Sequence, residues 1–65
     1  MATSAKAQLP QVRFRQVGEP KYVVHVLGEM AGYVPPGPLK YYGLTEQRAS
    51  QLREFAEILR DELNA

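Results

Sequence analysis

Residues Tyr22-Val23-Val24-His25-Val26-Leu27 decide which fold this sequence predicts. Valine and tyrosine dominate the run, and β-branched and aromatic residues are typical of strands. Because successive side chains of a strand point to opposite faces, the run divides into two sets. One face would carry Tyr22, Val24 and Val26, and the other Val23, His25 and Leu27. Both faces are largely apolar, so the sequence predicts a strand that needs cover on both sides.

The residues before this run predict a second strand. Val12 and Phe14 alternate with Arg13 and Arg15, which is typical of a strand with one solvated face. The segment Gly18-Glu19-Pro20-Lys21 favours a turn, because glycine reaches unusual backbone angles and proline lacks an N–H donor. We therefore expect an antiparallel hairpin between the two segments.

The register of this hairpin decides which residues share a face. A loop with an odd number of residues sets Phe14 opposite Val24, whereas an even loop mixes apolar with basic side chains. We prefer the odd loop, because it gives a clean core face of Val12, Phe14, Tyr22, Val24 and Val26. The second face would then carry Arg13, Arg15, Val23, His25 and Leu27.

The C-terminal third of the chain predicts a helix. Thr45 is an acceptable N-cap, although Arg48 occupies the position where a capping box has Glu or Gln. Apolar residues then recur at three- and four-residue spacing and form one stripe, made of Ala49, Leu52, Phe55, Ala56, Leu59 and Leu63. Ile58 lies outside the stripe, where it either widens the core contact or marks a second, exposed contact.

Together these elements predict an α+β fold. It consists of an antiparallel β-hairpin or a three-stranded β-meander packed against one C-terminal α-helix, with residues 30–34 as a turn or a short third strand. Pro35-Pro36-Gly37-Pro38 ends that segment, since prolines cannot donate to a sheet. We expect residues 1–10 to form a flexible tail and residues 11–65 to form a single small domain.

Size and composition favour association with a partner. A chain of 65 residues without cysteine cannot use disulfides or a thiolate metal site, which are the usual supplements to a small core. Self-association, most simply as a homodimer, or binding to another protein is the remaining supplement. The net charge is only +1, and there is no signal peptide or membrane-length apolar run, so we expect a cytoplasmic protein.

The residue types exclude most catalytic chemistry. His25 is the only histidine and there is no cysteine, so neither a cysteine nucleophile nor a multi-histidine metal site can form. The glycines follow no phosphate-binding spacing. We expect no enzyme, no catalytic site, no cofactor, no metal site and no small-molecule substrate.

The first functional hypothesis is a protein-interaction module, acting as an adaptor or an inhibitor of another protein. Small stand-alone adaptors and phage- or plasmid-encoded inhibitors are similar in size and in their lack of catalytic groups. Tyrosines flank the proline-rich segment, where they either pin the loop onto the domain or serve as interface anchors. The predicted interface residues are Val23, Leu27, Tyr33, Tyr41, Tyr42 and Ile58.

The alternative hypothesis is DNA binding through a basic sheet face. Up to Lys40 the chain holds five basic residues against two acidic ones, while the remainder holds three against five. The Arg13-Phe14-Arg15 segment, the Tyr22–Val26 strand and the Tyr42-Gly43-Leu44-Thr45 entry into a helix resemble the arm-site binding domains of phage and transposon integrases. That resemblance implies a three-stranded sheet in the major groove of DNA, with Arg13, Arg15, Lys21 and His25 as the contact residues.

Overall fold

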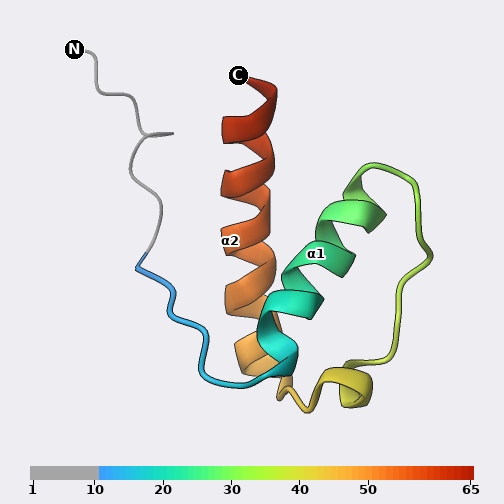
Figure 1. The fold of residues 1–65 in the computed structure, drawn as a ribbon, viewed down its shortest axis with the longest axis vertical. Coiled ribbons are helices and arrows are strands. Elements are labelled where there is room, and N and C mark those ends of the chain that lie inside the picture. Colours follow the sequence, from blue (N-terminus) through green and yellow to red (C-terminus); the bar gives the residue numbers. More distant parts are fainter. Residues whose placement is uncertain (1–10) are drawn as a thin grey trace.

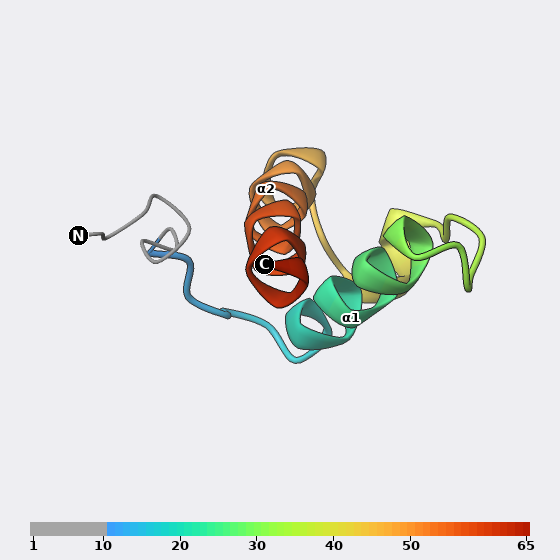
Figure 2. The same ribbon diagram turned by 90° about the horizontal axis from the view of Figure 1, so that it is seen from above.

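The computed structural model describes residues 11–65, and this part of the chain contains helices only (Figure 1). Helix α1 spans Gly18–Met30, a 3-10 helix η2 spans Leu39–Tyr42, and helix α2 spans Glu46–Asn64. Helix α1 packs against both α2 and η2. The two long helices cross at an angle (Figure 2), and in the view of Figure 1 they diverge toward their C-terminal ends.

The predicted α+β fold is therefore wrong. No strand is present among residues 11–65, so neither the hairpin nor the β-meander exists there. Residues 11–15 have no regular secondary structure, and this segment contacts α2 through Phe14 and the carbonyl of Arg13. Its Phe14 ring meets the Phe55 ring edge to face, with centroids 6.2 Å apart. The flexible tail expected for residues 1–10 lies outside the described residues.

The run that suggested a strand forms the middle of α1. Side chains at helical spacing face the protein interior, because Glu19, Tyr22, Val23 and Val26 are all buried. Val24, which belonged to the predicted core face of the strand, is 68% exposed. Pro20 does not end the chain's regular structure but lies in the first turn of α1, where a missing N–H costs no helical hydrogen bond.

Residues 30–34, the predicted third strand, form the end of α1. Gly32 adopts a left-handed φ of 83°, and the N–H of Gly32 donates to the carbonyl of Glu29 at 3.0 Å. The N–H of Tyr33 donates to the carbonyl of Gly28 at 2.8 Å. These two bonds and the left-handed glycine make a Schellman motif, which terminates a helix and turns the chain away.

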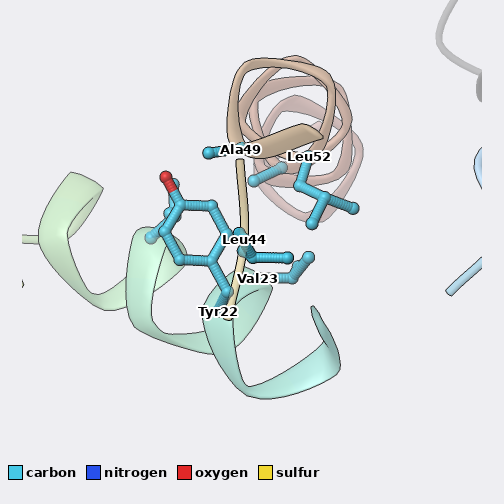
Figure 3. Close-up of a cluster of buried hydrophobic side chains, with 7 residues drawn as sticks. Tyr22, Val23, Leu44, Ala49 and Leu52 are labelled. Atoms are coloured by element: carbon cyan, nitrogen blue, oxygen red, sulfur yellow. The ribbon is translucent and has the colours of Figure 1, made fainter. Parts of the chain in front are cut away.

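The predicted C-terminal helix and its cap are confirmed. The side chain of Thr45 accepts a hydrogen bond from the backbone N–H of Arg48 at 3.1 Å, and α2 follows directly. The stripe of α2 packs against α1 in one core, part of which is drawn in Figure 3. Its buried residues are Tyr22, Val23, Val26, Leu44, Ala49, Leu52 and Ala56. None of the described helices has the length and apolar character needed to span a bilayer.

Candidate interaction surfaces

The most strongly held charged group of the molecule is Glu19, in the first turn of α1. Its side chain is fully buried and receives two hydrogen bonds from the guanidinium of Arg48, each 2.9 Å long. The backbone N–H of Arg15 also donates to Glu19, and the guanidinium of Arg48 donates to the carbonyl of Arg13. One ion pair therefore joins α1, α2 and the segment 11–15.

The role of this pair is structural. The hydrogen bond from Arg48 lowers the pKa of Glu19 from 4.5 to about 2, against the opposing effect of burial. A carboxylate that is permanently ionised and closed off from solvent cannot exchange protons with a substrate. The perturbed pKa thus marks the point where three segments meet.

Because the pKa of Glu19 is lowered on folding, the free energy of unfolding depends on pH in the acidic range. Because the pKa in the folded chain, about 2, lies below the ordinary value of 4.5, the unfolded chain takes up the proton first. The stabilising effect is complete above pH 4.5 and is lost as the pH falls toward 2. We expect the urea midpoint, followed by circular dichroism, to fall across this interval. Glu57→Gln, which removes an exposed carboxyl, should leave the profile unchanged, and a flat profile in the parent chain would contradict the expectation.

A second ion-pair cluster holds the other end of α1 to α2. Glu29 accepts a hydrogen bond from Arg53 of α2 and contacts the ring of His25, with His25 Nε2 3.0 Å from Glu29 Oε2. Burial acts to raise the pKa of Glu29, but the hydrogen bond and charge of Arg53 outweigh it and the pKa is lowered. His25 Nε2 also lies 3.0 Å from the carbonyl oxygen of Pro35. His25 therefore fixes the proline-rich loop to α1.

The four residues predicted to contact DNA lie on two different elements and not on one sheet. Arg13 and Arg15 are exposed on the segment 11–15, where they line an open groove of about 570 Å³ together with Arg48 and Gln51 of α2. Lys21 is exposed on α1, and His25 faces the proline-rich loop. Without a sheet among residues 11–65, the surface that would enter the major groove is missing. The integrase-like architecture is thus corrected together with the fold.

The predicted protein-interface residues divide into two groups. Tyr33 and Tyr41 are 84% and 80% exposed, so both are open to a partner. Val23 instead lies in the core, and Tyr42 packs edge to face on Tyr22 with ring centroids 5.3 Å apart. Two further residues, Leu27 and Ile58, are partly exposed. Val23 was predicted on the second face of a strand, but the helical spacing of α1 places it in the interior.

Sequence reasoning missed an exposed apolar surface of the described residues, which we call the outer face of α1. It is formed by Val17, Pro20, Val24, Leu27 and Ala31. Val17 is 88% exposed and Val24 68% exposed, whereas Leu27 is half-buried at the edge of the core. The spacing along the chain alternates between three and four residues, which is the spacing of a coiled-coil seam. This helical period was the signal in the sequence, and the strand interpretation concealed it.

Among residues 11–65, no three or more acidic or histidine side chains are grouped closely enough to hold a metal ion. Where α1 and α2 separate, an open groove of about 220 Å³ is lined by Leu27, Met30, Ala31, Arg60, Leu63 and Asn64. Comparison with known proteins gives no match to any protein-family model, curated protein or solved structure. Function is therefore argued from the exposed surfaces.

Proposed function

We propose that this protein is a small non-enzymatic interaction module that associates with a second copy of itself through the outer face of α1. The observation that carries the proposal is that α1 has a second apolar stripe beside the one that packs in the core. One stripe forms the core with α2, and the other is the outer face, which adjoins the core at Leu27. An apolar stripe on a helix is normally packed against another element. Here the second stripe has no cover from the described residues.

The spacing on the outer face favours another helix as its cover. Side chains that alternate at three- and four-residue steps form a narrow seam, into which the side chains of a facing helix fit. A second α1 presents the same seam, so a two-fold contact would be self-complementary. The small size of the chain also favours a second copy, because oligomerisation adds the apolar burial that a single small core lacks.

Charge selects the orientation of such a pair. Lys21 is exposed on α1 near its N-terminal end and is the basic residue that borders the outer face. Parallel helices would bring the two Lys21 side chains together, whereas an antiparallel pair separates them and also opposes the helix dipoles favourably. We therefore propose an antiparallel α1–α1 contact. Tyr33 and Tyr41, which are exposed, remain open to a further protein partner, as the role of an adaptor or inhibitor requires.

Val24→Lys tests the proposal, because it places a charge at the centre of the seam. Sedimentation equilibrium should show a dimer for the parent chain, and Val24→Lys should raise its dissociation constant by at least about tenfold, since an unpaired charge would be buried in the contact. Far-ultraviolet circular dichroism should stay unchanged, because Val24 is exposed in a single copy.

The matched control is Tyr41→Lys, which introduces the same charge at an exposed aromatic residue of η2. It should leave the dissociation constant of the dimer within about twofold. A parent chain that sediments as a monomer at about 1 mM would overturn the proposal, since an affinity weaker than that is too low for a specific assembly. Equal weakening by both variants would also contradict it, because it would place the contact elsewhere.

A further inference from the structure

The proline-rich segment after α1 is a second recognition element, distinct from the outer face of α1. We propose that residues 34–38, Val34-Pro35-Pro36-Gly37-Pro38, followed by Lys40 in η2, are a preorganised polyproline II ligand for the aromatic-lined groove of an SH3-type domain. This inference does not depend on self-association, because it concerns different side chains and a different partner.

The residue types hold the segment in the required conformation. Proline locks its own φ near the polyproline II value, and each residue before a proline is restricted to extended or polyproline II angles. Val34, Pro35 and Gly37 all precede a proline. Pro38 has φ −71° and ψ 137°, close to the ideal polyproline II geometry. These restrictions and the angles of Pro38 favour polyproline II geometry from Pro35 up to the start of η2.

The three-residue period of polyproline II assigns one edge of the segment to the protein and leaves two edges free. Val34 and Gly37 share the inner edge: the side chain of Val34 lies against Gly28, and Gly37 lies against the ring of His25. A Cβ at Gly37 would come within 3.2 Å of that ring, so glycine is what allows this close approach. Pro35, Pro36 and Pro38 are exposed on the other two edges.

Hydrogen bonds fasten the segment at several points. The N–H of Tyr33 is bonded to the end of α1, His25 Nε2 lies 3.0 Å from the carbonyl oxygen of Pro35, and the N–H of Tyr41 donates to the carbonyl of Pro38 at 3.1 Å. A ligand that is already fixed in its bound conformation loses little conformational entropy when it binds. The fold thus presents the prolines in the form that a partner would otherwise have to impose.

The exposed prolines and a nearby charge indicate the partner. Pro35 and Pro38 form a Pro-x-x-Pro pair, which docks into grooves lined by aromatic side chains. Lys40 follows Pro38 by two residues and is exposed, so it adds a positive charge at one end of the segment. An aromatic groove with an acidic rim complements both features, and this combination favours an SH3-type domain over a purely aromatic groove.

The test is titration of the intact chain into a panel of isotopically labelled SH3 domains, followed by nuclear magnetic resonance. We expect saturable shifts at the aromatic groove of at least one domain. Pro35→Ala combined with Pro38→Ala should weaken binding at least about tenfold, because it removes both docking rings. The matched control is Glu54→Ala, which truncates an exposed side chain of α2 that belongs to neither proposed surface and should leave the affinity unchanged.

Two results would overturn the proposal. One is the lack of any groove shift up to about 1 mM of the chain. The other is binding that the double proline variant does not weaken while its circular dichroism matches that of the parent chain. The Val24→Lys variant should bind the same SH3 domain with the same affinity as the parent chain. Its behaviour therefore separates a failure of this inference from a failure of self-association through the outer face of α1.

Discussion

Arg48→Met is expected to leave the chain largely unfolded at room temperature. The substitution removes both hydrogen bonds to the fully buried carboxylate of Glu19 and the bond to the carbonyl of Arg13. Breaking one partner of a buried pair leaves an uncompensated charge in the interior, which is among the most destabilising changes a protein can undergo. A domain of this size has little stability to lose. Loss of the helical circular dichroism signal is the measurement.

Two further variants make this expectation specific. Replacing both partners, with Glu19→Leu and Arg48→Met, should restore part of the helical signal, because no unpaired charge then remains in the interior. Arg60→Met removes an arginine that bonds only to its exposed neighbour Asp61 among the described residues, and it should shift stability by no more than about 0.5 kcal/mol. A urea midpoint of Arg48→Met equal to that of the parent chain would contradict the structural role of the pair.

This ion pair also explains why the fold of the first half could not be predicted from the sequence. Residues 22–27 are apolar at nearly every position, so they fit a strand period and a helix period equally well. The helix period becomes clear only when Glu19 is counted with Tyr22, Val23 and Val26 as a core residue. A glutamate is counted as polar until its partner is known, and Arg48 is 29 residues away in the sequence. Only the packed structure brings the two together.

The sequence was sufficient to predict an element where the interactions that form it join residues close together in the chain. Thr45 bonds to a residue three positions along the chain, and the cap of α2 was predicted for that reason. The Schellman end of α1 is equally local, yet Gly32 was assigned to the turn or short third strand expected over residues 30–34, because α1 itself had not been recognised. An error about one element thus propagated to the next.

The candidate surfaces were predicted in part, for a reason that does not depend on secondary structure. A run that is apolar at every position needs cover on both sides whether it is a strand or a helix. The type of secondary structure decides only which side chains are exposed. The predicted strand placed Val24 on the core face, whereas in the helix Val23 is in the core and Val24 is exposed to solvent. The proline-rich segment keeps its conformation in either fold, since proline restricts the backbone locally. Tyr33 and Tyr41 beside it are exposed accordingly.

Leu52→Ala is expected to have the second largest effect on stability. Leu52 is fully buried between α1 and α2, where it contacts the core around Tyr22 and Val23 (Figure 3). Removing a buried leucine side chain costs about 2–5 kcal/mol, because apolar burial is lost and a cavity remains. Since a single core in so small a domain supplies only about 3–5 kcal/mol, the variant should be close to half unfolded in water. Urea denaturation of both chains, followed by circular dichroism, is the measurement.

Leu63→Ala is the matched control, because it removes the same atoms from the same stripe of α2. Leu63 is 71% exposed, since α1 has diverged from α2 before that turn is reached. Its truncation should therefore change stability by no more than about 0.5 kcal/mol. A loss for Leu63→Ala as large as that for Leu52→Ala would mean that the C-terminal turns of α2 are covered in solution. The splayed arrangement of the two helices would then be contradicted, because exposed side chains cannot contribute that much to folding.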